Sequence, residues 1–275
     1  MGDVLETRII PEAIAARQPP GVRTKIPRII FQTFKTATVT PAMWAAARSW
    51  SDVNPDFEYR FFDDEACRAA LEADFGRRAR DAFDALPAGA FRADLWRYCA
   101  LAIHGGVYAD IDTVCKRPLQ ELIRAEDEFI VARGERPWFL FNAFICSVPG
   151  HAFLLGLIER AIDLVLKGDL RPPFEIVGPA ALGGRVNTAI GRAERAPIAL
   201  GMHRENGFSF RILRKLVWPA PFQRPGRTHD LFRTRVLDGF RTVFLCKYEG
   251  YVSDLEALGI EHWSRGQPDP RLGPW

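Results

Sequence analysis

The sequence predicts an α/β fold in which strands alternate with helices around a largely parallel sheet. Short apolar segments that suit buried strands alternate with longer amphipathic segments through the first half of the chain. The 275 residues are 48% hydrophobic and 26% charged, which suits a globular protein with one main core. We expect a flexible lead-in over residues 1–25, where Pro19-Pro20-Gly21 interrupts regular structure, and a single domain over residues 26–275.

Each expected element follows from its apolar spacing and from the residues at its ends. In chain order, strands are expected over residues 26–34, 57–62, 107–110, 129–132, 141–148, 212–218 and 242–246, and helices over residues 42–50, 63–74, 77–86, 90–104, 153–166, 179–190 and 252–258. The helix over 90–104 is the clearest, because Phe91, Leu95 and Tyr98 fall on one helical face. Asp63 or Asp64 suits an N-cap, and Gly105 suits the residue that ends a helix.

Charge and cysteine usage exclude several classes of protein. With 37 basic and 34 acidic residues the net charge is +3, too balanced for nucleic acid to be the main partner. The five cysteines lie far apart without metal-type spacing, which predicts reduced, buried thiols in a cytoplasmic protein. The N-terminus lacks the pattern of a signal peptide, and no apolar run reaches 18 residues. We therefore expect a soluble cytoplasmic protein, with peripheral docking at the inner face of a membrane left open.

The octet from Gly105 to Asp112 (GGVYADID) is the most informative segment of the chain. It predicts a short buried strand that runs into two carboxylates at positions i and i+2. Because side chains alternate along a strand, Asp110 and Asp112 are expected on the same face, at the carboxyl end where α/β sheets bind ligands. Two neighbouring carboxylates suit a hard divalent cation that also holds phosphate oxygens. A two-carboxylate glycosidase is the rival chemistry, but residues at i and i+2 suit chelation better than flanking a sugar.

The preceding helix supplies a second pair of charges. Asp94 and Arg97 are helical neighbours at i and i+3. A surface ion pair would stabilise the helix by about 0.2–0.5 kcal/mol and no more. A functional pair would offer a carboxylate to sugar hydroxyls and a guanidinium to phosphate.

Five ordered motifs resemble the glycosyltransferases with a DXD sugar-binding region, the family of the yeast initiating mannosyltransferases and bacterial capsular polysaccharide enzymes. These motifs are Ile26–Lys35 (IPRIIFQTFK), Asn54–Glu65 (NPDFEYRFFDDE), Arg92–Tyr98 (RADLWRY), His104–Thr113 (HGGVYADIDT) and Lys116–Leu119 (KRPL). Weaker matches are Asn142–Ser147, Pro149–His151, Gly178-Pro179, Lys247–Tyr251 and His262-Trp263. The first five span about a third of the chain in the family's order.

The resemblance implies a Rossmann-like fold of GT-A type, in which helices flank a mixed sheet and helical and loop elements are added at the C-terminus. It also implies a nucleotide-diphosphate sugar donor, Mn²⁺ or Mg²⁺, and transfer with retention. No sequence feature marks a nucleophilic carboxylate on the opposite face of the sugar, so we expect front-face displacement. The implied acceptor is a glycan or a lipid-linked molecule, in the synthesis of a surface polysaccharide.

Residue by residue, the resemblance also implies a set of site residues. Asp94, Arg97 and Asn142 would be catalytic. The donor would be bound by Asp94, Arg97, Tyr108, Asp110, His262 and Trp263, and the metal by Asp110, Asp112 and His262.

One position departs from the family pattern. Phe31 stands where most members have a histidine in the first strand motif, so any donor contact from that histidine is absent. Nucleotide preference and rate are the properties that this change affects, while the predicted fold is unaffected.

Three other classes of function stay open at this stage. A metal-dependent sugar-nucleotide phosphohydrolase would use the same carboxylates, and the Phe31 departure also fits a sugar-nucleotide binding protein without activity. A toxin-type protein glycosyltransferase would share the site but modify a protein. Residues 204–235, rich in arginine and aromatic residues, suit either a solvated basic surface or a face that contacts anionic lipid headgroups.

Overall fold

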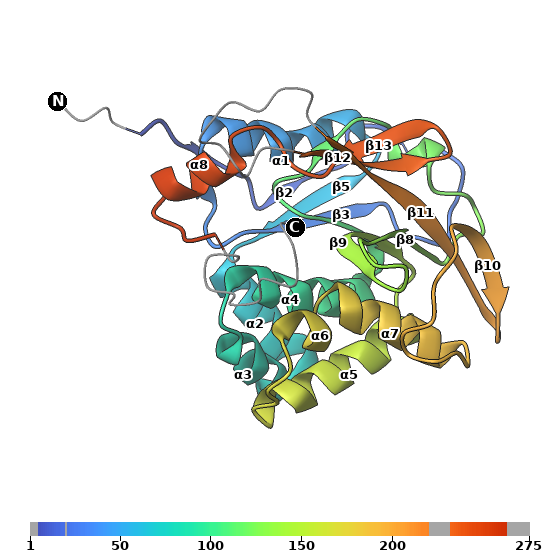
Figure 1. Cartoon of the computed structure of the whole chain (residues 1–275). Coiled ribbons are helices and arrows are strands. Elements are labelled where there is room, and N and C mark those ends of the chain that lie inside the picture. The colour runs from blue at the N-terminus through green and yellow to red at the C-terminus, as the bar shows by residue number, and fades with distance from the viewer. Residues whose placement is uncertain (1–4, 20, 220–231, 263–275) are drawn as a thin grey trace.

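A mixed sheet forms the centre of the computed structural model, which describes residues 5–19, 21–219 and 232–262 (Figure 1). Its strands lie in the order β2 (Ala13–Ile14), β5 (Glu58–Phe62), β3 (Ile29–Thr33), β6 (Gly106–Ala109), β9 (Leu140–Ser147), β8 (Phe129–Arg133), β11 (Phe208–Pro219), β12 (Phe232–Asp238), β13 (Arg241–Leu245) and β7 (Val114–Cys115). Strand β10 (Gly201–Glu205) pairs with β11, and β1 (Arg8–Ile9) pairs with β4 (Thr38–Val39) in a separate small sheet. The predicted α/β class is confirmed.

The strand directions define two edges of this sheet. Strand β3 is parallel to β5 and β6, and β8 is parallel to β11. Strand β9 runs antiparallel between β6 and β8, so β3, β5, β6, β8 and β11 all run the same way. We call the edge where these five strands end the carboxyl edge, and the opposite one the amino edge. The expectation of a largely parallel sheet was wrong for the second half, where β9 and β12 run against these five strands and β13 pairs antiparallel with β12.

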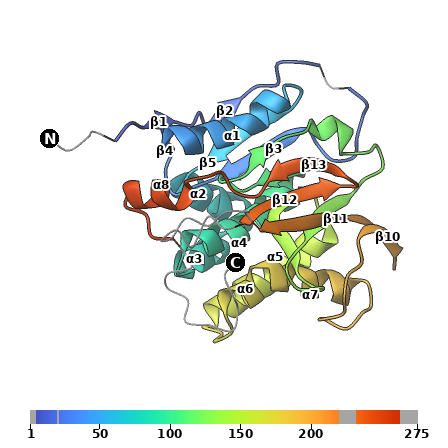
Figure 2. The same ribbon diagram turned by 45° about the horizontal axis from the view of Figure 1, so that its top comes forward.

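Helices cover both faces of the sheet (Figures 1 and 2). They are α1 (Pro41–Val53), α2 (Asp64–Phe75), α3 (Arg77–Ala85), α4 (Gly89–His104), α5 (Ala152–Leu166), α6 (Pro173–Ile176), α7 (Pro179–Ala189) and α8 (Tyr251–Ala257), with a 3₁₀ turn at Leu119–Glu121. Helices α1 and α8 lie on one face, and α2 to α7 lie on the other. Neighbouring residues of β3 enter different cores, Ile30 on the α1 side and Phe31 on the α4 side, as strand alternation requires.

The sequence signals at helix ends act as expected. The Asp63 carboxylate caps α2 by accepting the Ala66 N–H at 2.9 Å, and Thr40 caps α1. Gly105 and Gly106 make the turn from α4 into β6 with φ of 63° and 99°. A Cβ on Gly106 would come within 2.6 Å of the Ile29 carbonyl oxygen, so β6 reaches the sheet only through glycine.

The structure contains several elements that the sequence did not predict, and most of them are very short. Strands β1 and β2 lie inside residues 1–25, the segment predicted as a flexible lead-in, and β2 pairs with β5 at the end of the sheet. Two-residue strands carry no period, so their sequence did not predict them. Helix α6 and strands β4, β7, β10 and β12 were not predicted either.

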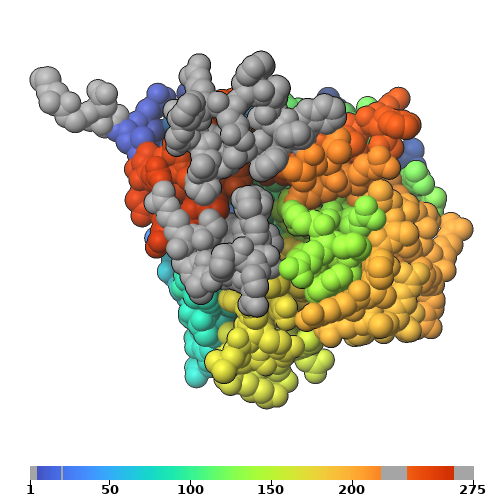
Figure 3. All heavy atoms as spheres, in the orientation of Figure 1, coloured from blue at the N-terminus to red at the C-terminus, as the bar shows by residue number. Residues whose placement is uncertain are grey.

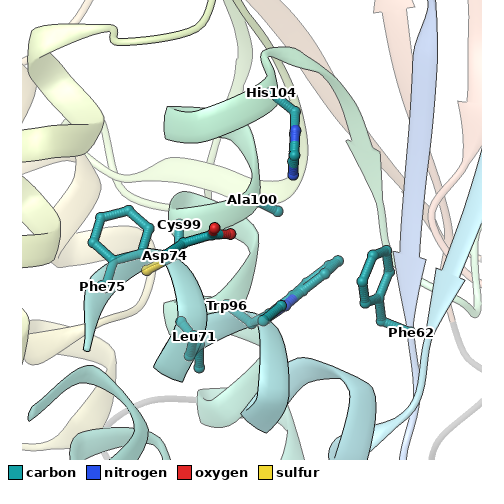
Figure 4. A pocket seen from close by; sticks show the side chains of 9 residues that line it. Phe62, Leu71, Asp74, Phe75, Trp96, Cys99, Ala100 and His104 are labelled. Carbon is teal, nitrogen blue, oxygen red and sulfur yellow. The ribbon is translucent and has the colours of Figure 1, made fainter. Parts of the chain in front are cut away.

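The cores are closely filled on the α4 side. A cavity of about 20 Å³ lies between α2, α4 and β5, with Trp96, Cys99 and His104 in its wall (Figure 4). That volume suits about one water molecule. All five cysteines are buried and free, as predicted. No helix in the described part of the chain is both long and apolar enough to cross a membrane.

Candidate active site

Asp110 and Asp112 lie on a turn that follows β6 at the carboxyl edge. The Asp110 N–H donates to the Ala143 carbonyl of β9 at 2.9 Å, and the Thr113 N–H returns to the Asp110 carbonyl at 3.1 Å. The strand ends at Ala109, so the prediction that strand alternation orients both aspartates was wrong. Two side chains hold this turn in place, because the Gln32 amide and the Thr113 hydroxyl both donate to the Asp110 carbonyl.

The Asp110 carboxylate joins a buried network to the surface. Its Oδ1 accepts a hydrogen bond from the Tyr108 hydroxyl at 2.9 Å and forms an ion pair with Arg97 Nη2, also at 2.9 Å. Its side chain is still 30% exposed, whereas Tyr108 is fully buried. Tyr108 was predicted to bind the donor. In this structure Tyr108 reaches the site through Asp110, and its predicted contact with the donor stays a prediction.

Arg97 is the centre of the buried network. Its Nη2 lies 3.0 Å from Asp94 Oδ1, its Nη1 donates to the Asn142 carbonyl at 2.7 Å, and its guanidinium lies 4.4 Å from the Tyr108 ring centroid. The side chain is only 3% exposed, so the surface ion-pair interpretation of Asp94 and Arg97 was wrong. Burial raises the pKa of Asp94 to about 7, Asp110 adds to this rise, and Arg97 and Asn142 oppose it.

Asn142 fixes Asp94 from the opposite side. Its amide nitrogen donates to Asp94 Oδ1 at 2.9 Å and to the Tyr98 hydroxyl oxygen at 2.7 Å. The Tyr98 hydroxyl in turn donates to the Val177 carbonyl at 2.8 Å, which ties the network to the end of α6. Asn142 therefore orients the Asp94 and Arg97 pair in this conformation, and its predicted contact with the sugar stays a prediction.

Asp112 differs from the other acidic residues of the site. No described side chain donates a hydrogen bond to its carboxylate, and it is half-buried. Burial raises the pKa of Asp112 to about 7, Asp110 adds to the rise, and Lys247 opposes it. Three carboxylates thus face two cations, Arg97 and Lys247. This negative excess on oxygen donors fits a hard divalent cation.

The C-terminal residues approach the site through α8. The Tyr248 N–H, three residues before α8 begins, donates to the Asp112 carbonyl at 3.0 Å, which brings this segment beside the aspartates. Burial raises the pKa of Tyr251 well above its usual range, and the charges of Asp112 and Asp110 add to this. The His262 ring lies edge-on to Tyr251 at 6.2 Å. Within residues 5–19, 21–219 and 232–262, no three His, Cys, Asp or Glu side chains form a metal-type cluster, so His262 as a third ligand stays a prediction. Trp263 lies outside the described residues.

Sequence reasoning missed several residues that shape the site. Gln32, which supports the Asp110 turn, also accepts from the Tyr59 hydroxyl at 2.9 Å. Its neighbour Phe31 is fully buried and stacks on His104 at 5.7 Å. Phe31 therefore packs in the core on the α4 side, and the effect of its departure from the family pattern on nucleotide preference and rate stays a prediction. Strand alternation was the available signal, since it places Gln32 and Phe31 on opposite faces.

Comparison with known proteins identifies the segment that carries this site. Residues 42–130 match the family model described as the glycosyltransferase sugar-binding region containing the DXD motif. The match runs from α1 to the first two residues of β8 and includes Asp94, Arg97, Asp110 and Asp112. The predicted resemblance to DXD-containing glycosyltransferases is confirmed.

Curated relatives match over the same part of the chain. Inositol phosphoceramide mannosyltransferase 3 of Schizosaccharomyces pombe is 34% identical over 136 residues, which is 49% of this chain and 37% of that protein. Mannosyl phosphorylinositol ceramide synthase SUR1 of Saccharomyces cerevisiae is 33% identical over 158 residues, 57% of this chain and 40% of that protein. The initiation-specific α-1,6-mannosyltransferase of Candida albicans is 28% identical over 176 residues, which cover 53% of this chain and 46% of that protein. The chain thus spans less than half the length of each of these relatives.

Among solved structures, the PaToxG glycosyltransferase aligns with a TM-score of 0.49 at 15% sequence identity, covering 59% of this chain and 69% of that one. The mixed sheet flanked by helices, seen in the chain itself, fits the expected GT-A type.

Proposed function

We propose that this chain, which carries the sugar-binding region of the DXD glycosyltransferases, transfers a sugar from a nucleotide-diphosphate sugar to a hydroxyl-bearing acceptor. The observation that carries the proposal is the pair Asp110 and Asp112 at the carboxyl edge, inside the matched region and backed by the buried Arg97. Ligands of α/β sheets bind beyond this edge.

A divalent cation fits this donor set, and Asp110, Asp112 and the predicted His262 would hold it. When bound, Mn²⁺ or Mg²⁺ supplies Lewis-acid stabilisation of the charge that develops on a departing diphosphate.

The residues of the chain then have distinct roles. The positive charge of Arg97 offsets the repulsion between the Asp94 and Asp110 carboxylates, so both can lie next to the same guanidinium. Tyr108 holds one Asp110 oxygen and leaves the exposed side of that carboxylate for a ligand. Asn142 fixes Asp94, whose second oxygen is the group we assign to a donor-sugar hydroxyl.

The names of the curated relatives favour mannose as the transferred sugar and a phosphoinositol lipid or a glycan as the acceptor. Retention at the anomeric carbon and a role in surface polysaccharide synthesis in the cytoplasm are part of the same proposal. Retention is testable by NMR, which distinguishes α from β product when a donor of known anomer is used.

We restrict the proposed contact with anionic lipid to the exposed residues of the segment 204–235. Arg211 is buried against Asp127, and Lys215 is buried and paired with Glu135, so neither belongs to an exposed basic face. Arg204 and Arg214 are exposed, while residues 220–231 and the side chains of Trp218, Phe232 and Arg233 lie outside the described part. Vesicle sedimentation tests the remaining surface: equal binding to neutral and anionic vesicles would exclude it.

A thermal-shift panel of UDP, GDP and CMP sugars, with and without Mn²⁺, tests the proposed function. A true donor raises the melting temperature only when the cation is present, because binding to the folded state adds to its stability. Asp112→Asn should abolish the shift. No shift with any nucleotide sugar would contradict the proposal.

Turnover assays separate the remaining alternatives. A phosphohydrolase consumes donor equally fast without acceptor, whereas a transferase consumes it slowly until acceptor is added. Sugar that enters protein rather than glycan or lipid would identify a protein glycosyltransferase of the toxin type.

A further inference from the structure

Lys247 is an exposed cation that lies between β13 and α8. In Figure 3 the orange atoms of β12 and β13 and the red atoms of α8 lie on one face of the molecule. We propose that Lys247 binds the terminal phosphate of a nucleoside diphosphate and so makes the site select diphosphates over monophosphates. This inference rests on the proposed transferase function and gives a role to a residue that the predicted site did not include.

Strand pairing brings Lys247 to Asp112. Strand β13 runs parallel to β11, because each pairs antiparallel with β12, so β13 also ends at the carboxyl edge. It pairs with β7, and the last pair is Leu245 with Val114. Two residues further in the same register, Lys247 comes opposite Asp112. The Tyr248 N–H donates to the Asp112 carbonyl at 3.0 Å, so the two segments are still side by side at this point.

Burial alternates in step along these two segments. Thr113 and Cys246 are both buried, whereas Asp112 is half-buried and Lys247 is exposed. Residues that lie opposite each other in an antiparallel pair have their side chains on the same face of the sheet. The Lys247 side chain and the Asp112 carboxylate therefore lie on the same side, toward solvent.

The two charges face each other without forming an ion pair. Among the described residues Lys247 has no hydrogen-bond or ion-pair partner, and its ammonium lies 5.0 Å from the Tyr251 ring centroid. Opposite side chains of an antiparallel pair, with Cβ atoms about 4.5–5.5 Å apart, are close enough to pair directly. Here the ammonium lies over the aromatic ring instead, so both it and the Asp112 carboxylate keep their capacity to bind a ligand.

The contacts of Tyr248 fix the segment that carries this lysine. The Tyr248 hydroxyl donates to Asp254 Oδ2 at 2.7 Å, and the same oxygen accepts from Thr40 Oγ1 at 2.5 Å. Thr40 is the N-cap of α1, while the Tyr248 N–H binds the turn at Asp112. Lys247 therefore extends from backbone that is anchored to both α1 and the DXD turn. Such anchoring lowers the entropic cost of holding a ligand.

The arrangement of charges indicates the class of ligand. Asp112 is one of the two carboxylates proposed to hold a divalent cation, which also binds phosphate oxygens. Arg97 is buried and already paired with Asp94 and Asp110, whereas the Lys247 ammonium is exposed. An ammonium beside such a cation suits a second phosphate group. A diphosphate supplies one group to each, and a monophosphate has none left for Lys247.

Matched nucleotides test this inference. The affinities of UDP, UMP, GDP and GMP are measured by isothermal titration calorimetry with excess Mn²⁺, by displacement where direct binding is weak. The proteins are wild type, Lys247→Gln, Lys247→Arg and Lys116→Gln. Lys116 is the matched control, because it is also exposed and lies at the other end of the β7–β13 pairing, where its N–H donates to the Val243 carbonyl at 2.9 Å.

We expect Lys247→Gln to weaken the preferred diphosphate about tenfold and its monophosphate less than about twofold, because one charge-assisted hydrogen bond is lost. Lys247→Arg should recover most of the affinity, and Lys116→Gln should match wild type. The melting temperature without ligand should stay that of wild type, since both lysines are exposed.

The inference is overturned if Lys247→Gln weakens neither nucleotide, weakens both alike, or binds them as Lys116→Gln does. A wild-type protein that binds no nucleoside diphosphate and no nucleotide sugar in the presence of Mn²⁺ would instead overturn the proposed function.

Discussion

The two edges of the sheet each hold a buried arginine and aspartate pair, but the pairs differ in what surrounds them. At the amino edge Arg211 lies 2.6 Å from Asp127, and both side chains are almost fully buried. Asp127 also accepts the Arg124 N–H, and Arg211 also binds the Leu122 carbonyl and Asp238. These contacts join the strand starts to the neighbouring loops, and the partly exposed Asp238 at their outer end is itself paired with Arg117.

At the carboxyl edge the corresponding pair of Arg97 and Asp94 extends outward. Arg97 also binds Asp110, which is 30% exposed, and Asp112 beyond it has no described side-chain partner. Burial of an ion pair is therefore no sign of function in this protein. The difference lies in whether the network ends in carboxylates that still have capacity to bind a ligand.

Asp127→Ala should cause the largest effect, a loss of folding stability, because it removes one partner of the ion pair at the amino edge. Removing Asp127 leaves Arg211 with only the partly exposed Asp238 as a counter-charge, which costs up to about 3–5 kcal/mol. Denaturant unfolding measures this loss. The donor KM of the folded protein should stay within twofold of wild type, and a donor-binding defect without loss of stability would assign Asp127 to the active site instead.

Asp112→Asn, at the carboxyl edge, should lower activity without lowering stability. We expect turnover to fall by about 10²–10³-fold, equivalent to about 3–4 kcal/mol of transition-state stabilisation. Because no described side chain depends on this carboxylate, the free energy of unfolding should not decrease. Turnover and unfolding are measured on the same preparation. Loss of both together would mean that Asp112 is structural.

His151 provides a pH test of the amino edge. Burial lowers its pKa to about 4, while the nearby Glu128 opposes this, and its Nδ1 accepts the Phe153 N–H at the start of α5. The unfolded state binds a proton near pH 6.5, so stability is present above that pH and is lost as pH falls toward 4. The expected loss is about 2–3 kcal/mol.

His151→Asn retains a capping acceptor without a titrating ring, so it is the matched control for that measurement. The difference in unfolding free energy between wild type and His151→Asn should change by about 2–3 kcal/mol between pH 6.5 and pH 4. Parallel pH curves for the two proteins would exclude His151 as the titrating group.

Tyr98→Phe should give the smallest effect. It should separate the orientation of Asp94 from the binding of the nucleotide. The hydroxyl holds Asn142 and reaches Val177, so its loss should cost about 1 kcal/mol of stability. A loosened Asp94 should lower kcat several-fold while the nucleotide KM stays nearly constant. Steady-state kinetics with varied donor measure this. An unchanged kcat would show that the chain from Val177 to Asp94 is only structural.

Local signals in the sequence predicted most of the fold. The helices with clear periodicity and caps, such as α2 and α4, agree with the structure to within one or two residues at each end. Periodicity could not predict β2 or β7, because two residues form a strand only when a neighbouring strand is present to pair with them. The antiparallel direction of β9 likewise depends on long-range pairing.

The sequence predicted which residues form the site but not how deeply they are buried. Motif order identified Asp94, Arg97, Asp110 and Asp112, and the structure brings the first three into one bonded network. Strand alternation did not predict that Tyr108 is enclosed, because β6 is covered on both faces. The roles of Tyr98 and Gln32 depend on contacts across 79 and 78 residues of chain, which no local pattern contains.

Crystals grown with Mn²⁺ and the nucleotide sugar selected by the thermal-shift panel provide the most direct test of the central claim. Anomalous scattering locates manganese without ambiguity. We expect a single strong peak within coordination distance of Asp110 and Asp112, about 2.1–2.3 Å from their oxygens, with the diphosphate beside it. Bound nucleotide without manganese at these two carboxylates, or manganese held elsewhere on the chain, would contradict the account.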